Sequence, residues 1–247
     1  MSFMYMPSFD QLAYGFYPKE KSDKMLSMYG SWVLLSLLLI SSIPVIIVFA
    51  WFRIAKYKFL TVRFLLTLLA GAAAFFPALI LQNLLNFTIP AGGRLYFFYH
   101  VFVRIAFTEE LSRFLILIAF FMISSRIEKD KKAAATGLVA GLGFAIIENA
   151  VYGASNTDVL LLRTVTAAPL HAACGSRVGT AAAMIRSNPV LSLMRLITAA
   201  IIHGTYNFMI VRQGIISMVA VLITATVFAS TIMEIRMWNK QEENLLH

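Results

Sequence analysis

Ionisable and amide side chains occur inside apolar stretches of this sequence, where a charge is costly. A charged group at the centre of a membrane helix costs about 2.5 to 3.5 kcal/mol on insertion scales, so such groups usually face the protein interior and have a function. Carboxylates and imidazoles are also the side chains that most often transfer protons in catalysis. The candidate catalytic residues are Glu109, Glu110, Glu148, His171, His203 and Asn207, with Arg113 close to the first two.

The spacing of these residues predicts how they are oriented. Glu109 and Arg113 are four residues apart and share one face of a helix, whereas Glu110 points about 100° away and is free to face another group. His203 and Asn207 are also four residues apart, so an imidazole and a carboxamide share a helix face. We therefore expect Arg113 to form a structural ion pair with one glutamate while the neighbouring glutamate carries out chemistry.

Seven apolar segments are long enough to position these residues in a bilayer. A helix needs about 20 apolar residues to cross the hydrocarbon core, and seven windows qualify, approximately 32–52, 62–85, 97–123, 133–153, 159–184, 191–211 and 215–235. The sequence therefore predicts an all-α, polytopic transmembrane bundle of about seven helices. We expect an extracytoplasmic N-terminal segment 1–31, a single helical domain 32–235 with its catalytic core at 97–211, and a cytoplasmic tail 236–247.

The composition also favours a membrane protein. Of the 247 residues, 60% are hydrophobic and 13% are charged, which is more apolar surface than a soluble core of this size can bury. The single cysteine, Cys174, excludes a disulfide framework and a cysteine-rich metal site. The net charge of +9 indicates basic loops that meet anionic membrane lipids. Nucleic acid is not an expected partner, because no basic and aromatic binding module is present.

Basic residues predict the orientation of the bundle, since they accumulate in cytoplasmic loops. Twelve of them follow the odd-numbered segments, and six, Arg163 among them, lie on the opposite side. This ratio predicts a multi-pass protein of the cell membrane with its N-terminus outside and its C-terminus in the cytoplasm. At about 1.5 Å of rise per residue, the polar groups of four segments then lie between the bilayer middle and its outer third. They are therefore expected to form one site.

The charge of this site is a further constraint. Three carboxylates face one internal arginine, so the site would be doubly negative with neutral histidines. Burial and like charge both favour the neutral form of a carboxyl group. We expect at least one of the three to be protonated or to share a proton, which suits a general acid or base.

In its motifs the sequence resembles the PrsW family of glutamic-type intramembrane proteases, within the clan that includes the CAAX prenyl endopeptidases. The family pattern is Glu-Glu-x-x-Lys or Arg, then Phe-x-x-x-Glu, then a late His with a polar partner four residues on. The matching segments are Glu109-Glu110-Leu111-Ser112-Arg113, Phe144-Ala145-Ile146-Ile147-Glu148 and His203-Gly204-Thr205-Tyr206-Asn207. The resemblance covers about residues 97–211, and Asn207 stands where the family can have aspartate.

The resemblance implies a peptidase that cuts in or near the membrane. The expected substrate is a single-pass membrane protein, and in some bacteria such enzymes cut a membrane-anchored anti-sigma factor. In the expected mechanism, Glu110 or Glu109 acts as general base on a confined water, assisted by Glu148. His171 also assists this water, and the late histidine and its polar partner donate to the developing oxyanion. This mechanism requires no covalent intermediate and no cofactor.

Three other functions remain open. Glu148, His171 and His203 can supply three ligands to Zn²⁺ with an open fourth position, as in a metalloprotease, although the chain has no His-Glu-x-x-His sequence. A proton-coupled transporter or channel also places Glu and His inside helices, but no repeated pair of broken helices is present. A non-catalytic scaffold would not need the full set of glutamates. The sequence does not predict an oligomeric state.

Overall fold

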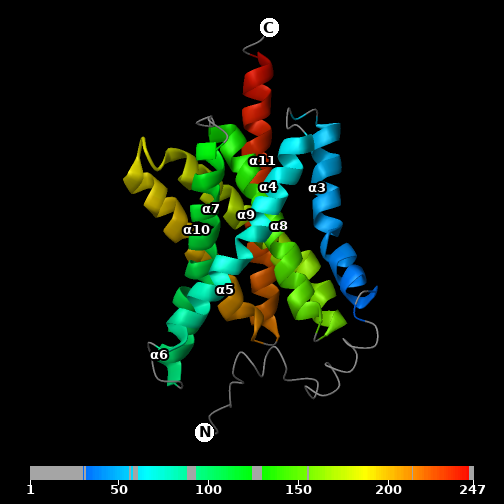
Figure 1. Ribbon diagram of the computed structural model, residues 1–247, viewed down its shortest axis with the longest axis vertical. Coiled ribbons are helices and arrows are strands. Elements are labelled where there is room, and N and C mark those ends of the chain that lie inside the picture. The colour runs from blue at the N-terminus through cyan, green and yellow to red at the C-terminus, as the bar shows by residue number, and fades with distance from the viewer. Residues whose placement is uncertain are drawn as a thin grey trace.

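The computed structural model describes residues 30, 32–55, 57, 61–87, 93–123, 130–154, 156–212 and 214–244. Within this part of the chain the regular structure is helical and contains no strand, which confirms the all-α prediction. Successive long helices run in opposite directions along the long axis of the molecule (Figure 1). The predicted extracytoplasmic segment 1–31 lies, apart from Gly30, outside the described residues.

In the described part of the chain the α-helices run in this order: α3 (Ile43–Ile54), α4 (Thr61–Ala73), α5 (Phe75–Leu84), α6 (Gly93–Phe98), α7 (Thr108–Ile123), α8 (Asp130–Gly153), α9 (Thr157–Met184), α10 (Pro189–Ile210) and α11 (Ile215–Asn244). A 3₁₀ turn, η1 (Leu85–Phe87), follows α5, and a π-helical segment, η2 (Tyr99–Phe107), joins α6 to α7. A further helical segment, Trp32–Ser41, precedes α3. The predicted tail 236–247 is helical as far as Asn244.

Among the described residues, three helices are long and apolar enough to cross a membrane: Thr61–Leu84, Lys132–Gly153 and Ile215–Met237. A fourth results if Trp32–Ser41 and Ile43–Ile54, which are bent by 42°, form one span. The remaining helices that carry the site do not meet this test, because α7 has only 16 residues and polar residues lower the hydropathy of α9 and α10. The seven crossings and their orientation therefore stay predictions.

Prolines explain the interruptions in two of the predicted segments. Pro44 is the second residue of α3 and has no N–H for the preceding turn, and the helix direction changes there. Pro77 lies in the first turn of α5, and the helix is interrupted just before it at Ala74. The second interruption separates α5, which contributes Gln82 to the site, from α4.

The helices α8 and α9 form the centre of the bundle. Over its apolar span α8 is 83% buried, against 17% for α11, so α8 mainly faces protein. Small residues bring the two backbones together, as they do in many membrane helix pairs. A Cβ atom on Gly137 would overlap the carbonyl oxygen of Gly175, and one on Gly141 would overlap that of His171. Gly141 therefore allows the backbone of His171 to lie directly against α8.

Replacing Gly137 with alanine tests this packing. The added methyl group would force α8 and α9 apart, and overpacking costs about 1 to 3 kcal/mol, whereas alanine is about 1 kcal/mol better than glycine in an open helix. Gly30→Ala is the matched control, because a Cβ there meets no atom within 4 Å. Thermal unfolding in detergent should show a lower midpoint for Gly137→Ala and an equal or higher one for Gly30→Ala. Equal midpoints for both variants would contradict the close contact.

Candidate active site

Arg113 lies at the centre of the site and is fully buried. Its guanidinium forms an ion pair with Glu110 in the same helix. It also donates to the carbonyl oxygens of Glu109 and His171, at 3.4 and 3.2 Å. On its other side it lies 4.8 Å from the centre of the Phe144 ring of α8. One cation therefore connects α7 with α8 and α9.

The partner of Arg113 is Glu110, whereas the four-residue spacing favours Glu109. Residues three apart are also neighbours on a helix, and Glu110 is held from a second side, since its Oε1 lies 2.8 Å from His203 Nδ1. Arg113 reaches only the backbone of Glu109. The glutamate that remains for other chemistry is therefore Glu109.

The side chain of Glu109 lies between α5 and α10. Its Oε1 accepts a hydrogen bond of 3.0 Å from Gln82 Nε2, and its Oε2 lies 3.7 Å from His203 Nε2. This Oε2 is buried and has no hydrogen bond to any described residue. A buried carboxylate oxygen without a donor is costly, so this atom is a candidate ligand for a cation.

Glu148, near the end of α8, is held by two residues of α9. Its Oε2 lies 2.6 Å from His171 Nε2 and 2.7 Å from Arg163 Nη2. Arg163 also donates to Asn149 Oδ1 at 3.0 Å and lies 4.0 Å from the centre of the Tyr152 ring. Both charged contacts use Oε2, and within the described part of the chain Oε1 of Glu148 has no hydrogen bond or ion pair.

Arg163 and Gln82 are the residues of this site that sequence reasoning missed. The charge count places Arg163 in a loop, but the structure places it in α9, with its side chain 14% exposed. The sequence did contain a pattern that indicates a role for Arg163 in the site. Arg163 precedes His171 by eight residues and so lies on the same face of the helix. Gln82 lies outside the predicted core 97–211, and no pattern marks it. With Arg163 included, three carboxylates face two guanidinium groups, which leaves one formal negative charge when the histidines are neutral.

His171 of α9 and His203 of α10 face each other, with ring centres 4.9 Å apart. In each ring, one nitrogen lies against a carboxylate. His171 Nε2 contacts Glu148. In the same way His203 Nδ1 contacts Glu110. The other ring nitrogens have no carboxylate of a described residue at hydrogen-bonding distance. His171 Nδ1 is buried without a hydrogen bond to a described residue, and His203 Nε2 faces Glu109.

Glu109, His171 and His203 therefore form a candidate metal site. Each offers one ligand atom, these atoms all lie within 4.8 Å of one another, and the three residues are buried. Two histidines and a glutamate are a donor set of catalytic zinc sites, which keep a fourth position open. A zinc-bound histidine usually donates its other N–H to a carboxylate or carbonyl, and both histidines have a carboxylate there. The residues fit a metal ion, with Glu109 in the position that the predicted alternative gave to Glu148.

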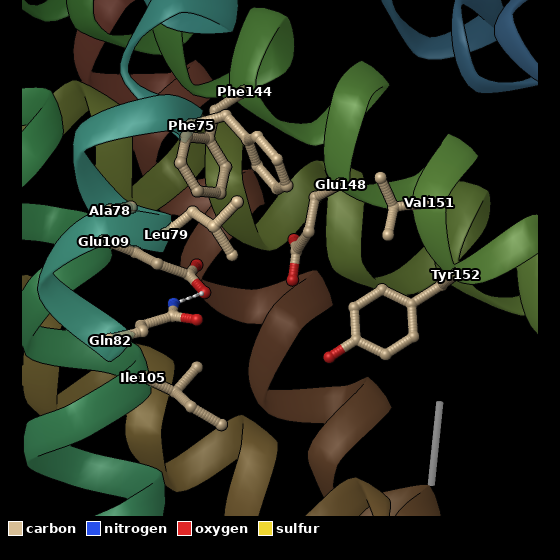
Figure 2. A pocket seen from close by; sticks show the side chains of 10 residues that line it. All are labelled: Phe75, Ala78, Leu79, Gln82, Ile105, Glu109, Phe144, Glu148, Val151 and Tyr152. Carbon is tan, nitrogen blue, oxygen red and sulfur yellow. Dashed lines mark hydrogen bonds between the residues drawn. The ribbon is translucent and has the colours of Figure 1, made fainter. Parts of the chain in front are cut away.

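A pocket reaches this site between α5 and α8. The carboxylates of Glu109 and Glu148 extend into it from opposite walls (Figure 2). Its empty volume is about 470 Å³, part of which is open to the surroundings. The other lining residues are mostly apolar, and two of them, Leu79 and Val151, are 44% and 55% exposed. Glu110 is not among the lining residues, so of the two adjacent glutamates only Glu109 is accessible from the pocket.

Asn207 lies one turn after His203 in α10 and is half-buried. Its carboxamide has no hydrogen bond to a described residue. The neighbouring Tyr206 is buried, and its hydroxyl shares a hydrogen bond of 2.8 Å with the hydroxyl of Thr166 in α9. The structure therefore brings five of the predicted catalytic residues together with Arg113, and the role of Asn207 as an oxyanion donor stays a prediction.

Comparison with known proteins adds a family match. The sequence profile described as PrsW family intramembrane metalloprotease matches residues 61–231, which is more than half of the chain. The match begins at the first residue of α4 and so extends beyond the residues 97–211 that the motifs cover. The description does not support the expectation that no cofactor is needed, and it agrees with the zinc alternative. No curated protein and no solved structure matches the chain.

Removing Arg163 tests its pairing with Glu148. In Arg163→Met the carboxylate of Glu148 stays buried opposite only His171, and removing one partner of a buried ion pair costs about 3 to 5 kcal/mol. Adding Glu148→Gln removes the uncompensated charge, so the double variant should be more stable than Arg163→Met alone. Denaturant unfolding of both single variants and the double variant measures this coupling. Strictly additive losses of stability would contradict the pairing.

Proposed function

Because the chain belongs to the PrsW family of intramembrane metalloproteases, we propose that it hydrolyses a peptide bond of a membrane-anchored protein in the pocket between α5 and α8. One observation carries this proposal. One potential ligand atom from each of Glu109, His171 and His203 converges within 4.8 Å, beside a pocket whose opposite wall contains Glu148.

In this proposal Glu109, His171 and His203 hold Zn²⁺. A bound zinc ion polarises a carbonyl group and makes a water molecule more acidic. The protein orients the ligands, because Glu110 Oε1 accepts from Nδ1 of His203 and Glu148 Oε2 lies 2.6 Å from Nε2 of His171. The second nitrogen of each ring is then unprotonated and keeps a lone pair that can bind a cation. The remaining single negative charge of the site also favours a cation.

We assign proton transfer to Glu148. Its Oε2 is held by His171 and Arg163, its Oε1 has no hydrogen bond or ion pair to a described residue, and the side chain lines the pocket. The carboxylate takes a proton from the water that attacks the scissile carbonyl carbon and then gives it to the leaving amine nitrogen. Glu110, one of the two glutamates predicted as the base, is instead paired with Arg113 and does not line the pocket.

The walls of the pocket support a membrane-embedded substrate. Leu79 of α5 and Val151 of α8 are both lining and exposed, so the pocket opens on an apolar face of the bundle. The scissile segment of a membrane helix must unwind, and its freed backbone groups then need hydrogen-bond partners. Gln82 and Tyr152 place an amide and a hydroxyl in the same pocket. A single-pass membrane protein fits these walls, and an anti-sigma factor is the specific substrate that the family resemblance suggests.

Two glutamate substitutions separate metal binding from proton transfer. Glu148→Gln should lower the cleavage rate of a reconstituted single-pass substrate by about 10²- to 10⁴-fold, the usual contribution of a general base, and should retain zinc. Glu109→Gln should lose both zinc and cleavage, because a ligand is removed. Metal analysis of the purified protein and a cleavage assay in lipid vesicles measure the two properties.

The control for these variants is Glu234→Gln, which changes a half-buried glutamate of α11 outside the site. It should match the wild type in both assays. Wild-type cleavage by Glu148→Gln would disprove its role as the base. Full activity of a chelator-treated wild type without zinc would disprove the metal assignment and favour a mechanism that uses glutamates alone.

Narrowing the opening of the pocket tests the path of the substrate. Leu79→Trp and Val151→Trp should raise KM for a membrane-embedded substrate severalfold, because a larger side chain obstructs the space between α5 and α8, and should leave the zinc content unchanged. Leu69→Trp in α4 is the matched control, since Leu69 is 64% exposed and does not line the pocket. An equal KM for all three variants and the wild type would place substrate access elsewhere.

A further inference from the structure

The hydrogen bond that orients Glu109 comes from α5, outside the three motifs. Gln82 Nε2 donates to Glu109 Oε1 at 3.0 Å inside the pocket (Figure 2). Among the described residues this is the one hydrogen bond of the Glu109 carboxylate. Because Gln82 holds Oε1, the other oxygen is turned toward His203 Nε2, at 3.7 Å. The donor on α5 therefore decides which oxygen faces the two histidines.

Gln82 is in turn held by the π-helical segment η2. Arg104 Nε donates to the carbonyl oxygen of Gln82 at 2.8 Å, and the hydroxyl of Tyr99 donates to that of Leu85 at 3.0 Å. These carbonyls lie at the end of α5, where the last carbonyl groups of a helix have no partner within it. A cation near a helix C-terminus also interacts favourably with the helix dipole. Arg104 and Tyr99 thus bind the end of α5 to η2.

The π-helical winding of η2 suits both contacts. Tyr99 and Arg104 are five residues apart, and the hydrogen bonds of a π-helix join residues i and i+5, so residues at this spacing lie close to one face. In an α-helix, with 3.6 residues per turn, the same two residues would point in different directions. His100 Nδ1 lies 3.1 Å from Arg104 Nη1 and restrains the guanidinium further. Segments of π-helix are rare and frequently occur at functional sites.

We propose that Gln82 is a positioning residue for the metal ligand Glu109, and that Arg104 of η2 keeps Gln82 in place. This inference rests on the proposed function, because it concerns the same site. Gln82 is not one of the three candidate ligands. It acts by holding Oε1 of Glu109, so that Oε2 stays directed at the space between the two histidines.

The test compares zinc affinity with the stability of the metal-free protein. Gln82→Leu removes the donor and keeps a similar volume, and it should weaken zinc binding by about 10- to 100-fold, the usual effect of losing a residue that orients a metal ligand. Asn83→Leu is the matched control, because Asn83 is exposed in the same helix and should bind zinc as the wild type does. Competition with a chromophoric chelator measures affinity, and thermal unfolding of the metal-free protein should give the same midpoint for both variants.

A second pair of variants tests the role of η2. Arg104→Met removes the donor to the Gln82 carbonyl and should also weaken zinc binding, whereas Arg104→Lys keeps a cationic donor and should restore much of the affinity. Wild-type affinity in Gln82→Leu would overturn the inference, as would equal affinities of the methionine and lysine variants.

The outcome for the wild type separates this inference from the proposed function. Zinc binding by the wild type no stronger than by Glu109→Gln would overturn both. Zinc binding by the wild type together with equal binding by Gln82→Leu would overturn the positioning role alone.

Discussion

Burial of the Arg113 guanidinium constrains four helices at once. A charge is tolerated in an apolar interior only when it is paired and hydrogen-bonded. Arg113 meets this requirement with the carboxylate of Glu110, with two backbone carbonyls and with the face of Phe144, so α7, α8 and α9 must approach one another closely. Since Glu110 also binds His203, the same charge aligns α10. The contacts that satisfy this single cation therefore align the helices that carry Glu110, His171 and His203.

The site contains two pairs that each consist of a carboxylate and a histidine. Glu110 occupies one nitrogen of His203, and Glu148 occupies one nitrogen of His171. The cations Arg113 and Arg163 each neutralise one of these two carboxylates. Glu109 is the carboxylate whose side chain has no arginine partner, and its unsatisfied Oε2 lies 3.7 Å from His203 Nε2. The excess of one negative charge is therefore located where three potential ligand atoms converge.

Two elements that precede the three motifs in the chain complete this arrangement. The helix α5 supplies Gln82 to Glu109 and one wall of the pocket, and η2 binds the end of α5 through Tyr99 and Arg104. The family match, which starts at residue 61, includes both elements. The close contact of α8 with α9 at Gly141 places the backbone of His171 within reach of Arg113. Packing outside the motifs thus determines where the side chains of the motifs meet.

The amino-acid sequence alone identified the all-α class, the motifs and five residues that do converge, because apolar length and intramembrane charge are local properties of the chain. Only the tertiary structure decided that Arg113 pairs with Glu110, which leaves Glu109 beside the histidines. Residues three and four apart are both neighbours on a helix, so spacing cannot choose between them. The choice depends on how each helix is rotated about its axis. That rotation is set by contacts with other helices, and the same contacts give Arg163 and Gln82 roles that no local pattern predicts.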